Sequence, residues 1–509
     1  MKCGLEKKRG SLSLSKGHKR YIFLIAFFFI CAFCFSQQTH PSIEPVFLPE
    51  DVLVNANRAG WSLSADEVFK LSLLFSECPL ESDEGLRCLE QFARLKEKVT
   101  ADDFMRQEPE ERGRAVLKLL YQDYLSSYDF NQTRTNVALQ TGVYNCVSSA
   151  LLYMAAAKAA GLEVRGQKTT EHAFCTVYVP GAKKGQLKKF DVETTNPYGF
   201  NPGSRETIEN EDKIQGYYVV PKKYYANRQE VSDGVFVGLI AGNICSFCIE
   251  QNDYQKAVPL GAARYELVRA ETSKAVNEVR RDFDVLASNY VNTDVDDAEV
   301  FSGYVDWFTG FIDRWGKTDF LQKNMDTALY NLLVLCLQQK DYTLAQTSFK
   351  KYKPYVTQKQ IATSQEILAD IFFDSRLEGL SVQEQIEIIN QAMALSQNQD
   401  EAFQNRAKLY LENAWLSILN ECMNIQEYED GYKKSAQALV GLPQSSKIKK
   451  MQKSFYDNCI VIIHNKFAKI ANAGDYDEAR RILEEGLVKF PDDKTLKSDL
   501  TLLNKRTSN

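Results

Sequence analysis

One short motif recurs in the second half of the chain and constrains its fold more than any other feature. The form D-Y-x-x-A occurs at Asp253–Ala257, Asp341–Ala345 and Asp475–Ala479, and Glu427–Gly431 is a degenerate copy. Each copy lies between two stretches whose apolar residues recur at helical spacing. An acidic residue suits the start of a helix, and a small residue lets two helices approach closely. The motif therefore predicts turns between paired helices.

This motif resembles the turn between the two helices of a tetratricopeptide repeat. In the last copy, Pro491 falls at that repeat's terminal proline position. The intervals between copies are not multiples of the roughly 34-residue period, so we expect an irregular α-solenoid. The resemblance implies a surface for protein or peptide partners, and the alternative is a helical domain that only stabilises its neighbour. We assign residues 229–509 to this TPR-like repeat domain.

The N-terminus has the composition of an export signal. Basic residues precede an unbroken apolar run from Tyr21 to Phe35. A positive start and a core of about 15 apolar residues are typical of a secretory signal, with Cys34 and Ser36 as small residues of a cleavage site. An uncleaved anchor is the alternative, although a spanning helix needs about 20 residues. We expect 1–36 to be a signal peptide or membrane anchor, and the protein to be exported: periplasmic, cell-surface or membrane-anchored.

Charge and cysteine usage exclude several classes of function. The net charge of −5 offers no basic surface for nucleic acid. The four histidines leave little material for a metal site, and no cofactor motif is present, so we expect neither. The cysteines follow no disulfide spacing pattern, although Cys78 and Cys88 could pair. Cys245 and Cys248 form a lone C-x-x-C, which we interpret as packing in a helix rather than zinc binding.

The first half of the chain divides into two parts. Residues 41–140 are predicted to be a helical lead-in, because Ser64 is a plausible N-cap for an amphipathic stretch. Residues 141–228 change character: a helix-favouring run begins at Cys146 and is stopped by Gly161. One helix followed by several strands predicts an α+β fold with an antiparallel sheet on the helix. The expected strands are Glu163–Lys168, Ala173–Val179, Lys188–Glu193 and Tyr217–Val220.

Three residues in the second part could carry thiol chemistry. Cys146 opens the predicted helix, where unpaired N–H groups and the helix dipole favour a thiolate. His172 begins a predicted strand, and Asp191 lies on the next one. Neighbouring strands would bring the carboxylate to the imidazole, and the helix start would bring the thiol to its other nitrogen. Taken singly, each residue more often has a structural role.

The order of these residues resembles the transglutaminase-like (papain-superfold) superfamily. The resemblance is carried by Cys146, Gly161-Leu162, His172-Ala173-Phe174 and Asp191. It implies an α+β core in which the cysteine helix packs on an antiparallel sheet, followed here by the all-α TPR-like solenoid.

The same resemblance implies roles for these residues. Cys146 would be the nucleophile on a carboxamide or peptide carbonyl, His172 the general base and acid, and Asp191 the residue that orients the imidazole. Water or an amine would resolve the acyl-enzyme, giving hydrolysis or transamidation. The oxyanion donors would be the Cys146 N–H and a second group, with Tyr144 and Gln140 as candidates.

Two functions are compatible with these observations. The first is an exported thiol enzyme that acts on protein or peptidoglycan-type amides. The second is a non-catalytic envelope scaffold whose helical repeats hold a protein partner. A thiol, an imidazole and a carboxylate in series beside an open cleft would favour the enzyme, and a buried thiol would favour the scaffold.

Overall fold

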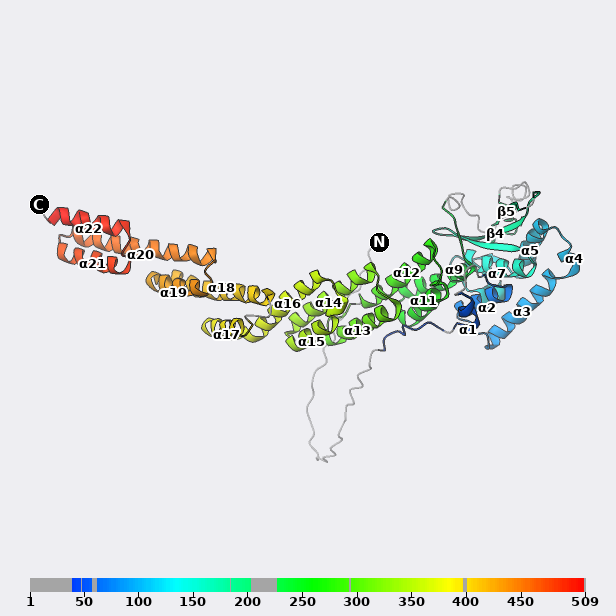
Figure 1. Ribbon diagram of the computed structural model, residues 1–509, viewed down its shortest axis with the longest axis horizontal. Coiled ribbons are helices and arrows are strands. Elements are labelled where there is room, and N and C mark those ends of the chain that lie inside the picture. Colours follow the sequence, from blue (N-terminus) through cyan, green and yellow to red (C-terminus); the bar gives the residue numbers. More distant parts are fainter. Residues whose placement is uncertain are drawn as a thin grey trace, which may run out of the picture. The chain divides into compact units, whose positions relative to one another are not determined.

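Helices dominate the described part of the chain (Figure 1). The computed structural model describes residues 39–46, 48–56, 62–183, 185–202, 227–292, 294–396 and 401–507. The expected signal or anchor at 1–36 and the expected strand at Tyr217–Val220 lie outside these residues. From His40 to Asn509 the chain forms one compact unit.

The expected helical lead-in begins at a strong local signal. The Ser64 hydroxyl accepts from the Glu67 N–H at 3.2 Å, and the Glu67 carboxylate accepts from the Ser64 N–H at 2.7 Å. This reciprocal capping box fixes the first turn and leaves an apolar face to be buried. The helices before the sheet are α1 (Glu50–Ala56), α2 (Ala65–Phe75), α3 (Asp83–Val99), α4 (Asp102–Met105), α5 (Pro109–Asp123) and α6 (Thr135–Thr141).

A single buried helix, α7 (Cys146–Ala159), joins this lead-in to a small sheet. Its middle is fully buried because α2, α3, α5 and α6 pack on one side and the sheet packs on the other. As predicted, Gly161 ends the helix in the left-handed conformation at φ +73°.

The sheet has the order β5-β4-β3-β6 and is antiparallel throughout. Its register pairs Gly166 with Cys175 and Cys175 with Val192. Two further short strands form a separate parallel pair that ends where α7 begins. The strands are β1 (Ser127–Tyr128), β2 (Val143–Tyr144), β3 (Glu163–Lys168), β4 (Ala173–Pro180), β5 (Leu187–Val192) and β6 (Gln229–Val231).

The predicted fold class is wrong. Helices make up 70% of the described residues and strands only 6%, so the described part is mostly a helical, solenoid-like assembly. The expected α+β transglutaminase-like core would need a substantial sheet, and four short strands do not supply one. Each predicted local element from Cys146 to Asp191 does form. The helices before and after these elements contain many more residues than the sheet.

After β6 the described residues are mainly helical, and consecutive helices pack against one another. The elements are α9 (Asp233–Val237), α10 (Leu239–Glu250), α11 (Tyr254–Val268), α12 (Lys274–Val291), α13 (Ala298–Trp315), α14 (Asp319–Gln339), α15 (Tyr342–Tyr352), the 3-10 turn η3 (Lys353–Tyr355), α16 (Gln358–Leu377), α17 (Val382–Leu395), α18 (Glu401–Asn424), α19 (Tyr428–Gly441), α20 (Ser446–Asn472), α21 (Tyr476–Lys489) and α22 (Lys494–Thr507).

The D-Y-x-x-A motif lies at turns between these helices, as predicted. Asp253, Asp341 and Asp475 are N-caps whose carboxylates accept a backbone N–H of the first turn. The small residue of each copy is buried, and a Cβ on Gly431 would lie 2.3 Å from the Phe455 ring. The residue before each motif is left-handed, which reverses the chain between helices: Asn252, Lys340, Gln426 and Gly474.

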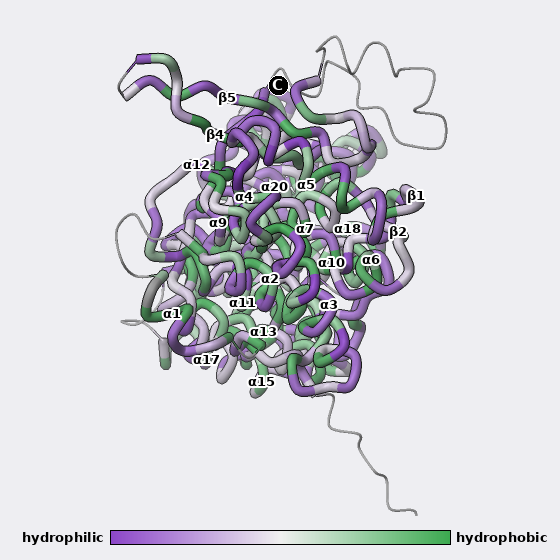
Figure 2. Tube along the Cα trace, turned by 90° about the vertical axis from the view of Figure 1, so that its right-hand side faces the viewer, coloured by the Kyte–Doolittle hydropathy of each residue, from purple (hydrophilic) through white to green (hydrophobic). Residues whose placement is uncertain are grey.

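One apolar stretch, Asp233–Glu250, has the length and hydropathy of a membrane span, with a mean hydropathy of 1.4. It comprises α9 and α10, and 67% of it is buried inside the fold. These helices pack against α2, α7 and α11 (Figure 2). We therefore interpret the stretch as a core element, since burial within the protein explains its apolar composition.

The first described residues are fastened to α13. The Trp307 indole donates to the Pro41 carbonyl at 2.6 Å, and the Trp315 indole donates to the Ile43 carbonyl at 2.9 Å. Buried indole N–H groups need acceptors, and here the backbone of an extended segment supplies them. These two hydrogen bonds therefore hold the backbone of residues 41–43 against α13.

Candidate active site

The position of Cys146 is set by the residue before it. Asn145 is the N-cap of α7, and its side-chain carbonyl accepts from the N–H groups of Val147 at 2.9 Å and Ser148 at 3.1 Å. The Ser148 hydroxyl in turn accepts from the Asn145 N–H at 3.0 Å. This double cap places Cys146 at the first helical position, at the positive end of the helix dipole.

His172 lies immediately before β4 and meets two partners. Its Nε2 is 2.7 Å from Glu193 Oε2, and both side chains are only 3% exposed. The Cys146 thiol also hydrogen-bonds the imidazole. The structure therefore brings a thiol, an imidazole and a carboxylate together in series.

The environment of His172 favours its charged form. Burial lowers the pKa of this imidazole, but the hydrogen bonds with Cys146 and Glu193 and the Glu193 charge outweigh burial and raise the pKa from 6.5 to about 10. The imidazole is consequently protonated at neutral pH. A protonated imidazole beside a thiol at a helix start is the arrangement that stabilises a thiolate.

Asp191, the carboxylate predicted to orient the imidazole, does not reach His172. The register of β4 and β5 pairs Asp191 with Thr176, and the Thr176 hydroxyl donates to Asp191 Oδ1 at 2.8 Å. Asp191 also forms an ion pair with Arg228. The carboxylate on the imidazole belongs to Glu193, two residues further along the chain. Sequence reasoning missed Glu193 because it placed the acid within the strand rather than just after it.

The backbone around Glu193 is held by several contacts. The Thr195 hydroxyl and N–H donate to Glu193 Oε1 at 2.7 and 3.2 Å, opposite the atom that meets His172. The Glu193 N–H donates to the Gly199 carbonyl at 2.8 Å. A Cβ on residue 199 would lie 1.8 Å from the Glu193 carbonyl oxygen, so only glycine fits there. This turn therefore fixes the carboxylate on the imidazole.

Two of the three candidate oxyanion donors already have hydrogen-bond partners. The Asn145 side chain accepts from the N–H groups of Val147 and Ser148, and among the described residues no acceptor is found for the Cys146 N–H. Gln140 Nε2 lies against Cys88 Sγ at 3.5 Å. Tyr144 is buried, and its hydroxyl accepts from the Tyr121 hydroxyl at 2.8 Å and donates to the Thr195 carbonyl at 3.1 Å. Tyr144 therefore holds the turn that follows Glu193, and its hydroxyl is not available as an oxyanion donor.

The other described cysteines are buried free thiols. Cys78 and Cys88 are neighbours but are not joined, and burial raises the pKa of Cys78 to about 11. Burial likewise raises the pKa of Cys245 to about 12, as suits a packed thiol. Among the described residues no cluster of three or more His, Cys, Asp or Glu side chains could hold a metal ion.

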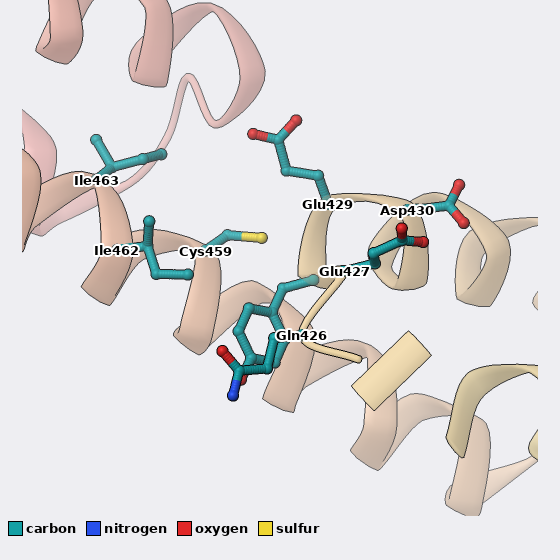
Figure 3. A pocket seen from close by; sticks show the side chains of 8 residues that line it. Gln426, Glu427, Glu429, Asp430, Cys459, Ile462 and Ile463 are labelled. Carbon is teal, nitrogen blue, oxygen red and sulfur yellow. The ribbon is translucent and has the colours of Figure 1, made fainter. Parts of the chain in front are cut away.

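Cys146 is itself buried, with 9% of the residue exposed. A hollow of about 310 Å³ lies elsewhere, between the start of α19 and α20 (Figure 3). It is lined by Glu427, Glu429 and Cys459, among others, and by no residue of the thiol site. The hollow is therefore separate from the site formed by Cys146, His172 and Glu193.

Comparison with known proteins assigns no family. No family model matches the chain, and no curated protein matches it. A solved structure described as "Crystal structure of menin reveals the binding site for Mixed Lineage Leukemia (MLL) protein" aligns with 79% of this chain and 94% of its own, at 13% identity and a TM-score of 0.32. A likeness at this level carries no argument about this protein.

Proposed function

We propose that this protein is a thiol enzyme that attacks a carboxamide or peptide carbonyl through Cys146 and forms an acyl-enzyme. The observation that supports it is the series Cys146–His172–Glu193, with a 2.7 Å contact between Nε2 and Oε2 and an imidazole pKa raised to about 10. A structural histidine does not need both a thiol at a helix start and a buried carboxylate. Three groups in this order are the components of nucleophilic catalysis.

The roles follow from the contacts. The Cys146 thiolate attacks the carbonyl carbon, and the Cys146 N–H donates to the oxygen as it becomes negative. The imidazolium of His172 gives its Nδ1 proton to the leaving amine as the C–N bond breaks. The neutral imidazole then takes a proton from water or an amine, which attacks the thioester and releases Cys146. Glu193 keeps the imidazole in the required tautomer throughout.

The N-terminal sequence supports action outside the cytoplasm, after export or from a membrane anchor. The helical half supports a role in holding a protein or peptide substrate.

A scaffold function is the second candidate, because Cys146 is buried and apolar side chains are exposed on the C-terminal helices. Leu395 is 87% exposed, Val440 84% and Val488 83%. Side chains of this kind contribute to protein interfaces. In this alternative the helical pairs hold a partner and the thiol is inert.

The rate of alkylation of Cys146 by iodoacetamide separates the two candidates. It is measured on the full-length protein by peptide mass spectrometry, between pH 5 and 9, for wild type and His172→Ala. An activated thiol reacts rapidly at pH 6 and loses this rate in the variant. Slow labelling that the variant leaves unchanged would exclude the enzyme and favour the scaffold. His464→Ala is the matched control, since His464 on α20 pairs with Asp499 instead.

A further inference from the structure

The hollow of about 310 Å³ between α19 and α20 lies where two apolar cores meet. One core includes Phe455 of α20, and the other includes Cys459, about one turn further along the same helix. The helix α19 approaches α20 closely at Gly431, where a Cβ would lie 2.3 Å from the Phe455 ring, and α21 does so at Gly486, where a Cβ would lie 2.9 Å from Ile463. The α20 side of the hollow falls between these two contacts. The hollow therefore marks the point where one packed pair of helices gives way to the next.

The wall that α20 contributes to the hollow is apolar (Figure 3). It consists of Cys459, Ile462 and Ile463, which are three and four residues apart and so share one face of the helix. Burial raises the pKa of the Cys459 thiol to about 11, so this side chain is neutral at pH 7. Ile462 is 51% exposed, and Ile425, which comes just before the opposite wall in the chain, is 57% exposed. Apolar side chains left half in water beside a hollow gain free energy when another apolar group covers them.

The opposite wall, formed by the start of α19, carries negative charge. All the charged residues that line the hollow are acidic: Glu427, Glu429 and Asp430. Asp430 pairs with Lys434 at 2.6 Å, and Glu429 pairs with Lys489. Glu427 stands where the other copies of the motif have a capping aspartate, but its side chain makes no capping hydrogen bond. Its carboxylate is therefore not used by the helix start and can meet a cation.

The volume of the hollow limits what it can hold. Ligand pockets usually measure about 300–1,000 Å³, so this one is at the small end of the range. It suits one or two side chains of a peptide. An aliphatic side chain next to a lysine or arginine matches both walls, because the apolar group would cover the α20 wall and the cation would meet the acidic wall.

We propose that the hollow is a docking site for a peptide segment in which aliphatic residues adjoin lysine or arginine. The aliphatic side chain packs against Cys459 and Ile462, and the neighbouring cation pairs with Glu427. Charge complementarity selects this partner over an acidic segment, which the carboxylates of the hollow repel. The site is separate from Cys146, so the inference stands whether or not the thiol is reactive.

The test measures the binding of two fluorescein-labelled peptides to the full-length protein by fluorescence polarisation at low salt. One peptide has the sequence Gly-Lys-Leu-Leu-Lys-Gly, and the other has glutamate in place of each lysine. We expect the lysine peptide to bind at least about tenfold more tightly, and its affinity to fall as salt is added. Absence of saturable binding of the lysine peptide, or equal affinity for the two peptides, would overturn the inference.

Four variants assign the binding to the hollow. Glu427→Gln should weaken binding of the lysine peptide about three- to tenfold, and Ile462→Ser about tenfold. The matched controls lie on α17: Glu387→Gln removes an exposed carboxylate, and Leu395→Ser removes an aliphatic side chain that is 87% exposed. Both controls should leave the Kd within about twofold of wild type.

Binding that survives Glu427→Gln and Ile462→Ser unchanged, or that falls equally in the controls, would place the peptide elsewhere and refute the inference. Circular dichroism confirms that each variant is folded. None of these variants should change the iodoacetamide labelling of Cys146, so the outcome is separate from that of the proposed function.

Discussion

Replacing Glu193 by glutamine is the sharpest test of the site geometry. The substitution keeps the shape and the contact with Thr195 but removes the negative charge from the atom that meets His172 Nε2 at 2.7 Å. The new amide offers N–H groups to Nε2, so this nitrogen must accept rather than donate. An imidazole whose Nε2 accepts a hydrogen bond cannot carry both ring protons, so the variant loses the imidazolium that would stabilise a Cys146 thiolate.

The magnitude follows from the burial of the pair. Both side chains are 3% exposed, so solvent does not screen the lost charge. A hydrogen bond to a charged partner contributes about 1.5–3 kcal/mol. We therefore expect the pKa of His172 to fall and the alkylation rate of Cys146 at pH 6 to drop by about one to two powers of ten, since about 1.4 kcal/mol corresponds to a factor of ten.

Asp191→Asn is the matched control. Asp191 is 26% exposed and pairs with Arg228 and Thr176, so its replacement changes only a surface contact of small energy. We expect its alkylation rate to stay within about twofold of wild type. A larger loss in Asp191→Asn than in Glu193→Gln would refute the assignment of Glu193. The assay is the same labelling of Cys146, with circular dichroism to confirm that both variants are folded.

Further predictions concern stability. Gly199→Ala places a Cβ 1.8 Å from the Glu193 carbonyl oxygen, so we expect a loss of about 1–3 kcal/mol in chemical denaturation and slower labelling of the thiol. Lys158→Met removes the cation from a pair whose side chains are 14% and 9% exposed and leaves Asp233 only the Leu63 N–H, which should cost about 3–5 kcal/mol; adding Asp233→Leu should recover part of it. Because the pKa of His172 is raised from 6.5 to about 10, the Tm advantage of wild type over Glu193→Gln should be full at pH 6.5 and disappear as the pH rises through 10, as measured by scanning fluorimetry.

Local signals in the sequence located several helix starts and ends. Ser64 with Glu67, Gly161 and the D-Y-x-x-A turns act on backbone groups within one or two turns of themselves. Such contacts form whatever the rest of the chain does, so a single sequence reveals them. The same reasoning placed Cys146 at a helix start and His172 at the start of a strand.

The predicted fold class failed for a different reason. The sequence predicts each strand from its own residues, but the share of sheet in the whole chain depends on how many helices surround it. Here the lead-in helices and α9 to α16 share one continuous apolar core with α7 and its four strands, and α16 to α22 pack around two further cores. The small sheet is therefore one part of a helical assembly.

What the sequence determined by itself is the set of turns, caps and candidate nucleophile, because these depend on neighbours along the chain. Only the tertiary structure decided which carboxylate reaches His172. The β4–β5 register pairs Asp191 with Thr176, and the close contact of Gly199 with Glu193 turns the chain just past the strand. A pairing register and a contact between backbones are properties of two segments together, so neither segment alone could reveal that Glu193 holds the imidazole.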